Sequence, residues 1–395
     1  MYTTHSFTEL AYSALSDNYK TIYSAANAGK KGCKIAAVVK ADAYGHGVAP
    51  CVKTLLSAGC DFFVVATLDE AREVKDALGA ANADVLVLQK VPLDRLSEAV
   101  SLGLTLTVVS PAHARELSAA AKKEGIFLPV HIKLNTGMNR LGFDARDGAR
   151  CAEEISSSVG KNLIIKGIFS HLHAATDKAR CDAQLKRFFD TCSCLSSLGI
   201  DTGVRHLSAS EGFLTSEEYI FDMIRAGICL YGYGAPNLTP VKRFAASIES
   251  INEVNAGDFI GYGTETVAER NMLVACVSAG YADGLLRSCR GAYVAVETEQ
   301  GFRPAKIVGN ICMDMFMIDV TPEEIGARVI PDGRVLIFGL SEEECDQLFS
   351  ALPEQKRYAA HLPTLAAHAG TIEYELLVST RCARGDRLSI DLPTD

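Results

Sequence analysis

Short apolar runs alternate with amphipathic stretches through the first half of the chain, and this alternation limits the folds available to it. The runs have the length and β-branched content of buried strands, and the stretches between them have helical spacing. Eight strand–helix units within about 235 residues are typical of a closed (β/α)8 barrel. An open doubly wound sheet is the alternative, but the number of units favours the barrel. The predicted strands are 35–40, 62–66, 85–88, 104–109, 130–135, 165–170, 204–208 and 228–231.

The pattern changes near Arg243, where closely spaced strand candidates separated by turns replace the alternation. One predicted helix, 341–351, interrupts them. We therefore expect an α/β chain in which residues 1–245 form the barrel and residues 246–395 form a mainly β domain. The predicted strands of this second domain are 246–253, 273–277, 292–297, 305–308, 316–320, 334–337 and 373–378.

Composition excludes several classes of protein. A formal net charge of −9 argues against nucleic acid as a partner. The chain has 13 cysteines, an odd number without metal-type CxxC pairs, which favours reduced thiols in the cytoplasm over disulfides or a metal site. No apolar run approaches the roughly 20 residues that span a bilayer, so we expect no membrane segment.

Lys40 stands at the end of an apolar run and is followed by a glycine-flanked loop that holds Tyr44. A lysine at the end of a buried strand is costly unless its ammonium is paired, hydrated or neutral, and a neutral amine can form a Schiff base. Lys40 is therefore a candidate covalent anchor for an aldehyde cofactor, with Tyr44 placed to bond a phosphate. The alternative is a lysine that extends into solvent at a barrel rim and has no catalytic role.

Further polar residues fall at the carboxyl ends of predicted strands, where the active site of a (β/α)8 barrel lies. They are Lys133 and Arg140 in the segment 131–142 at the fifth strand, His171 and His173 closing the sixth, and His206 and Ser210 at the seventh. Arg225 belongs to the segment that opens the eighth. Structural interpretations remain open: the histidines can be hydrogen-bonded core residues, and Lys133 with Arg140 a solvated surface pair. Ser210 can be the N-cap of a following helix, a position that also binds phosphate.

Five motifs in combination resemble the pyridoxal-phosphate-dependent alanine racemases over nearly the full length of the chain. They are VKADAYGHG (39–47), TGMNRLG (136–142), RAGI (225–228), GYADG (280–284) and CMD (312–314). The resemblance implies a barrel, a C-terminal β domain and a homodimer whose active sites each combine one barrel with the β domain of the partner. It also implies interconversion of L- and D-alanine, with D-alanine used for bacterial peptidoglycan.

The resemblance also implies roles for single residues. Lys40 matches the lysine that anchors pyridoxal phosphate and serves as the base on the D-alanine side, and Tyr281 matches the base on the L-alanine side. The positions that match phosphate contacts are Tyr44, Ser210, Gly227, Ile228 and Tyr374. Arg225 matches the arginine that faces the pyridine nitrogen, and His206 matches the residue that supports this arginine. Arg140 and His171 match groups in the hydrogen-bond network of Tyr281, and Met313 matches a backbone contact to the substrate carboxylate. Lys133 matches a lysine that is carbamylated in many members and that braces Arg140.

Other functions on this scaffold stay open at this point. A serine or broad-specificity racemase is the nearest alternative, although a bulky Tyr374 near the substrate side chain would favour a methyl group. A non-catalytic pyridoxal phosphate carrier would need neither the β domain nor Tyr281. A decarboxylase is disfavoured because the chain lacks a matching glycine-rich phosphate loop. One departure from the family pattern is Ala209, where an asparagine usually precedes the phosphate serine.

Overall fold

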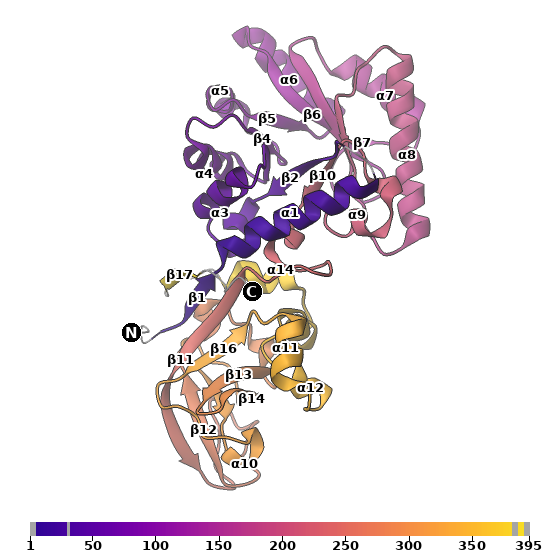
Figure 1. Ribbon diagram of the computed structural model, residues 1–395. Helices are drawn as coiled ribbons and strands as arrows, with labels where there is room; N and C mark the ends of the chain where they lie inside the picture. The colour runs from indigo at the N-terminus through magenta and orange to yellow at the C-terminus, as the bar shows by residue number, and fades with distance from the viewer. Residues whose placement is uncertain (1–4, 30–31, 381–385, 391–395) are drawn as a thin grey trace. The chain divides into compact units, whose positions relative to one another are not determined.

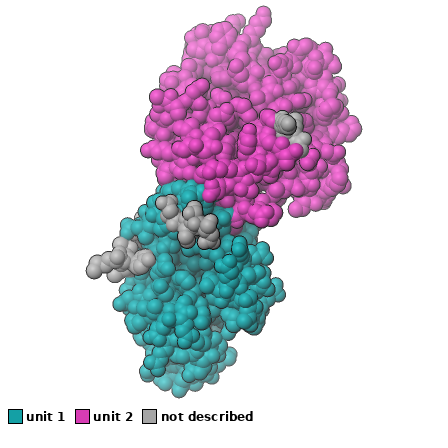
Figure 2. Space-filling view, viewed as in Figure 1, with its two compact units in different colours: residues 1–14, 44–46, 239–395 teal, residues 15–43, 47–238 magenta. Residues whose placement is uncertain are grey.

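The computed structural model describes residues 5–29, 32–380 and 386–390 of the chain. The chain divides into two compact units, which Figure 2 shows in different colours. The barrel unit comprises residues 15–43 and 47–238, and the β unit comprises residues 1–14, 44–46 and 239–395. Residues 1–14 and 239–245, which we expected in the barrel, cluster with the β unit. The chain therefore leaves the barrel unit after Ala43 and returns to it after His46.

Eight parallel strands form the main sheet of the barrel unit, in the order β10-β2-β3-β4-β5-β6-β8-β9, and a short β7 (Phe143–Asp144) pairs with β6. Strands β4, β5 and β6 of this sheet are labelled in Figure 1. The sheet closes where the backbone N–H of Arg225 donates to the carbonyl of Ser208 at 3.1 Å and Arg225 bridges Ala209 in parallel. The predicted barrel is thereby confirmed. Its strands are β2 (Lys34–Val38), β3 (Phe62–Val65), β4 (Asp84–Val87), β5 (Thr105–Val108), β6 (Leu128–Asn135), β8 (Leu163–Phe169), β9 (Val204–His206) and β10 (Met223–Ala226).

Helix α4 shows how local sequence chemistry starts a helix of the barrel. Helix α4 begins after Thr67, whose side chain forms a capping box with Glu70, and it buries Leu68, Ala71 and Val74 on one face. The helices are α1 (Tyr12–Gly29), α2 (Lys40–Gly45), α3 (Val48–Ser57), α4 (Leu68–Leu78), η1 (Leu93–Arg95), α5 (Leu96–Ser101), α6 (Pro111–Glu124), α7 (Gly148–Ser158), α8 (Lys178–Ser197), α9 (Gly212–Thr215), η2 (Glu217–Tyr219) and η3 (Ile228–Tyr231).

The predicted position of the eighth strand is wrong. Residues 228–231 form the 3₁₀ turn η3, closed by a bond from the N–H of Leu230 to the carbonyl of Gly227 at 2.9 Å. The strand is β10, which pairs in parallel with β2 from Met223↔Lys34 onward. The two segments were confused because a short buried apolar run fits a strand and a helical turn equally well.

The β unit is built on a ring of six antiparallel strands. The long strand β11 pairs with β16 through its first half and with β12 through its second half, and the order β12-β15-β14-β13-β16 completes the ring. Strands β1 and β17 extend the sheet from β11. The strands are β1 (Phe7–Leu10), β11 (Lys242–Val254), β12 (Met272–Val277), β13 (Tyr293–Thr298), β14 (Gly301–Val308), β15 (Phe316–Asp319), β16 (Arg334–Phe338) and β17 (Asp386–Ser389).

One predicted strand of the β unit is a helix. Residues 373–378 lie in α14 (Glu373–Ser379), which buries Leu376 and Leu377 and carries Glu373 and Glu375 in its first turn. Acidic residues at that end favour a helix, and the two leucines alone did not distinguish the alternatives. The other short helices are η4 (Tyr281–Asp283), η5 (Arg287–Cys289), α10 (Pro322–Ile325), α11 (Glu342–Phe349), α12 (Glu354–Arg357) and α13 (Leu362–His368). Across the described ranges, no helix has the length and apolarity needed to cross a membrane.

Candidate active site

Lys40 begins an unusual turn just after strand β2. The four residues that follow it, 41–44, are not glycine, yet all have φ between 53° and 56°. Left-handed conformation costs an L-amino acid roughly 1–2 kcal/mol per residue. Interactions outside the turn must therefore hold residues 41–44 in this conformation.

Glu70 holds the start of this turn. Its carboxylate accepts the backbone N–H of Ala41 at 2.8 Å, of Ala66 at 2.7 Å and of Thr67 at 3.1 Å. The backbone next to Lys40 is thus tied to the end of β3 and the start of α4. Sequence reasoning missed Glu70 as a site residue, although the signal was present as the capping-box spacing of Thr67 and Glu70.

The charge state of Lys40 follows from its surroundings. Burial lowers the pKa of its ammonium, and the positive charge of Arg140 lowers it further, whereas the carboxylate of Glu70 raises it. A lowered pKa increases the fraction of neutral amine, which is the form that attacks a carbonyl. Lys40 therefore has the electrostatic environment expected of a covalent anchor.

The predicted residues of the barrel unit lie at one end of the barrel, because the strands are parallel and the residues occur at or just beyond their carboxyl ends. Lys133 lies inside β6, His171 two residues beyond β8, and His206 at the last position of β9. Arg225 lies inside β10, with Gly227 directly after that strand.

Arg225 is the centre of the hydrogen-bond network in the barrel unit. It is 4% exposed, and its guanidinium donates to the Nδ1 atoms of His206 at 2.9 Å and of His171 at 3.1 Å. It also donates to the carbonyls of Ser170 at 2.8 Å and Leu207 at 3.0 Å. Burial and the charge of Arg140 lower the pKa of Arg225 to about 9, so it remains cationic at neutral pH.

The direction of these bonds fixes the histidine tautomers. Guanidinium only donates, so Nδ1 of His206 accepts and its neutral ring carries the proton on Nε2. That Nε2–H donates to Nδ1 of His131 at 2.8 Å. Burial lowers the pKa of His131 to about 3 and that of His206 well below its usual range, with the charge of Arg225 adding to both effects. His131, which the sequence analysis did not single out, therefore ends a row of hydrogen-bonded, uncharged histidines that supports Arg225.

His171, and not His173, belongs to this network. Burial lowers the pKa of His171 well below its usual value, and the charge of Arg225 lowers it further. His173 instead bonds through Nδ1 to Oε1 of Gln184 at 2.7 Å. The structure therefore gives His173 a structural role and places His171 beside Arg225.

Lys133 is buried, with its Nζ 4.3 Å from the centre of the Phe169 ring. Burial lowers the pKa of its ammonium well below the usual value, and the charges of Arg225 and Arg140 act in the same direction. A surface ion pair is therefore excluded for Lys133. An uncharged amine in this position is the form that can react with carbon dioxide.

Ser210 is buried, and its hydroxyl accepts the backbone N–H of Gly227 at 3.1 Å and of Cys229 at 3.4 Å. Helix α9 begins after Glu211, not Ser210, so the N-cap interpretation is wrong. A hydroxyl that accepts two bonds still has its own hydrogen to donate. The Ser210 hydroxyl, held by the N–H groups beyond β10, is therefore a candidate donor to a phosphate oxygen.

The β unit holds a second group of predicted residues. The backbone N–H groups of Tyr281 and Ala282 donate to the carbonyls of Cys312 at 3.1 Å and Met313 at 3.0 Å. A Cβ on Gly280 would lie 2.2 Å from the carbonyl oxygen of Met313, so only glycine permits this approach. The structure therefore brings Tyr281 and Met313 together, with the two residues 44% and 50% exposed.

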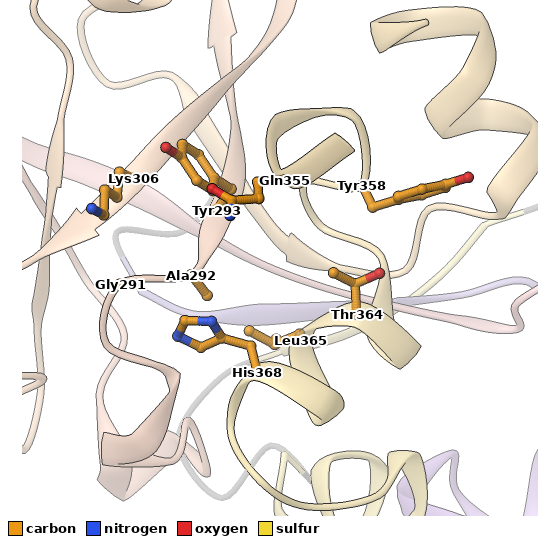
Figure 3. Close-up of a pocket in the computed structure, with 9 residues that line it drawn as sticks. All are labelled: Gly291, Ala292, Tyr293, Lys306, Gln355, Tyr358, Thr364, Leu365 and His368. Carbon is orange, nitrogen blue, oxygen red and sulfur yellow. The ribbon is translucent and has the colours of Figure 1, made fainter. Parts of the chain in front are cut away.

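Tyr44 and Tyr374 also meet in the β unit, with ring centres 5.9 Å apart and ring planes at 47°. Tyr44 is buried, and Tyr374 belongs to helix α14. A cavity of about 210 Å³ elsewhere in this unit is lined by Tyr293, Lys306 and His368, among others (Figure 3). None of the predicted site residues lines that cavity.

Comparisons with known proteins agree with this arrangement. The family model described as alanine racemase, N-terminal domain, matches residues 10–235, and that described as alanine racemase, C-terminal domain, matches residues 241–387. The chain is 32% identical to an alanine racemase of Desulfovibrio desulfuricans over 390 residues, covering 96% of each chain. It is also 32% identical to alanine racemase 1 of Caldanaerobacter subterraneus over 376 residues, covering 92% of this chain and 95% of that one.

Solved structures give the same result. The alanine racemase of Streptomyces coelicolor has a TM-score of 0.84 at 27% identity, covering 99% of both chains. That of Bartonella henselae, solved with covalently bound pyridoxal phosphate, has a TM-score of 0.82 at 25% identity, covering 98% of this chain and all of the other. Fold and site together define a barrel enzyme with a C-terminal β domain. The chain belongs to the alanine racemase family.

Replacing Glu70 tests whether its carboxylate stabilises the turn at Lys40. Glu70→Ala should lower the free energy of unfolding of the barrel unit by about 1–3 kcal/mol, because a capping box and charge-assisted bonds are lost. Urea unfolding followed by circular dichroism measures the change. Glu73→Ala, at an exposed position of the same helix, should change it by less than about 0.5 kcal/mol. Equal losses in the two variants would contradict the role given to Glu70.

Proposed function

We propose that this chain is an alanine racemase that interconverts L- and D-alanine with pyridoxal phosphate. The observation that carries the proposal is Lys40, whose pKa is lowered by burial at the carboxyl end of the barrel beside the network of Arg225. Membership of the alanine racemase family supports the reaction and the cofactor. The D-alanine formed would supply bacterial peptidoglycan.

The side chains present fit pyridoxal phosphate. Lys40 offers an amine to its aldehyde. Ser210 offers a hydroxyl and Ile228 a backbone N–H to its phosphate, and the N–H of Gly227 would exchange the Ser210 oxygen for the phosphate. Tyr44 and Tyr374 would add two phenols. Arg225 would face the pyridine nitrogen with His206 behind it. The positive charges of Arg225 and Arg140 both lower the pKa of His171, so this end of the barrel favours anions such as phosphate and carboxylate.

The residues of the chain then divide the proton transfers. When bound, the cofactor acidifies the Cα–H of the amino acid. Tyr281 would remove this proton from L-alanine while Lys40 returns one to the opposite face, and the roles reverse for D-alanine. Arg140 and the backbone of Met313 would hold the substrate carboxylate, and His171 would support Tyr281. Arg225 stays protonated at neutral pH and gives no proton to the ring nitrogen, which favours return of the proton to Cα over transamination.

We propose further that two copies of the chain share each active site. The β unit leaves Tyr281, Met313 and Met315 exposed by 44%, 50% and 40%. Large exposed side chains grouped with a proposed base favour an interface that a second copy covers.

Lys133, with its lowered pKa, is proposed to be carbamylated and to brace Arg140. A cytoplasmic location is proposed from the cysteine content of the chain.

A chiral assay tests the proposed reaction directly. Purified protein with pyridoxal phosphate receives L-alanine, L-serine or L-lysine in separate reactions. Fast formation of D-alanine with little D-serine or D-lysine is expected, because the pocket would exclude larger side chains. Comparable rates on several substrates would replace the narrow specificity with a broad one. Bound cofactor without racemisation of any substrate would favour a carrier protein instead.

Two substitutions separate the cofactor anchor from the second base. Lys40→Ala should remove the absorbance band of covalently bound cofactor, since the amine is lost. Tyr281→Phe should keep that band and lower kcat on the order of 10²- to 10⁴-fold, because only proton transfer is affected. Absorbance spectra and the chiral assay measure both effects. Retention of the band in the first variant, or normal turnover by the second, would overturn the assignment concerned.

Mixing these two inactive variants tests whether copies share active sites. If each site takes Lys40 from one copy and Tyr281 from the other, a hybrid dimer has one intact site. Equal mixing with subunit exchange should then restore about a quarter of wild-type activity, because half of the dimers are hybrid. Each variant incubated alone is the control. Hybrid dimers, detected by native mass spectrometry, that remain inactive would show that both bases come from one chain.

A further inference from the structure

Lys242 is a fully buried lysine at the start of strand β11, and the proposed reaction gives it no role. Its Nζ donates to the carbonyl oxygens of Thr380 at 2.7 Å, Leu377 at 3.1 Å and Gly45 at 3.4 Å. Burying an ammonium costs several kcal/mol unless hydrogen bonds replace its water. These carbonyls replace water as acceptors for N–H groups of the ammonium.

These carbonyls belong to the two segments that carry Tyr44 and Tyr374. Gly45 directly follows Tyr44 at the end of α2. Leu377 and Thr380 lie in the last turn and at the C-cap of α14, whose second residue is Tyr374. Carbonyls at a helix end lack partners within the helix, so the ammonium satisfies groups that need an external donor. One ammonium thus joins the segments of both tyrosines in the β unit.

The packing around Gly45 shows how tightly these segments fit. Gly45 has φ of +78°, and a Cβ there would lie 2.5 Å from the carbonyl oxygen of Leu377 and 3.3 Å from Nζ of Lys242. A contact this close leaves little room for the turn to move against α14. The same two segments carry the tyrosine rings, whose centres lie 5.9 Å apart.

We propose that Lys242 is a positioning residue for the phosphate of the cofactor. It fixes the two tyrosine-bearing segments relative to each other and acts on the phosphate through the phenols of Tyr44 and Tyr374. This inference rests on the proposed function, in which both phenols bind the phosphate. Loss of the ammonium should therefore weaken phosphate binding without removing the covalent anchor at Lys40.

The test compares two forms of the cofactor on the full-length apoenzyme. Pyridoxal phosphate and pyridoxal, which lacks the phosphate, are titrated into wild type, Lys242→Met and Lys306→Met, the last at an exposed position of the same unit. Lys242→Met should raise the Kd for pyridoxal phosphate about tenfold or more and that for pyridoxal less than about twofold. Lys306→Met should leave both unchanged. Lys242→Gln keeps an amide donor, so its Kd for pyridoxal phosphate should lie between those of wild type and Lys242→Met. If Lys242→Met does not fold, Lys242→Gln takes its place in the test.

A double-mutant cycle identifies the route of the effect. In a Tyr374→Phe background, Lys242→Met should raise the Kd for pyridoxal phosphate by a smaller factor, because the two residues act together. Equal weakening of both cofactor forms, or full additivity with Tyr374→Phe, would reduce Lys242 to a general structural role and overturn the inference. If the Kd for pyridoxal phosphate is unchanged in Lys242→Met while the wild type racemises alanine, this inference is overturned and the proposed function stands. A wild type that neither binds pyridoxal phosphate nor racemises alanine would instead overturn the proposed function.

Discussion

The left-handed turn after Lys40 is the constraint on which the proposed active site depends. Four consecutive non-glycine residues with positive φ are unfavourable by several kcal/mol in sum, so the turn exists only because its surroundings hold it. Glu70 binds the N–H of Ala41 at the start, and the side chain of Asp42 accepts the N–H of Val48 at 2.8 Å. Lys242 binds the carbonyl of Gly45 at the other end. A relaxed turn would change the distance between Lys40 and Tyr44, and thus between the proposed anchor and a proposed phosphate contact.

The electrostatics of the barrel end depend on a second constraint, the burial of Arg225. A buried guanidinium must satisfy its donors, and here backbone carbonyls and two neutral histidines accept them. Because the histidines accept, they stay uncharged, and Arg225 remains the fixed cation. The same charge helps to lower the pKa of Lys133. One buried cation therefore sets the protonation of its neighbours, which is how a site can keep reactive amines at neutral pH.

The sequence predicted the barrel because the barrel follows from local patterns, and strand ends together with the family resemblance indicated the candidate site positions. Parallel buried strands appear as β-branched runs, and polar residues at their carboxyl ends stand out against them. Two segments were misassigned, at residues 228–231 and 373–378, because short apolar runs do not distinguish a strand from a helical turn. Glu70 and Lys242 escaped notice for a different reason. Each looks like an ordinary helix-cap or strand-end residue, and its importance comes from contacts with residues far away in the chain. Positive φ at residues 41–44 is likewise unpredictable, since none of them is glycine.

Glu70 and Lys242 hold opposite ends of one turn, and this divides the tasks between them. Glu70 acts on the backbone beside Lys40, so its carboxylate bears on the amine that would carry the cofactor and move the proton. Lys242 acts beyond Tyr44 and on α14, so its ammonium bears on the phenols that would bind phosphate. The bonds of Glu70 and Lys242 therefore act on the same strained segment from its two ends, and each offsets part of the cost of its left-handed backbone.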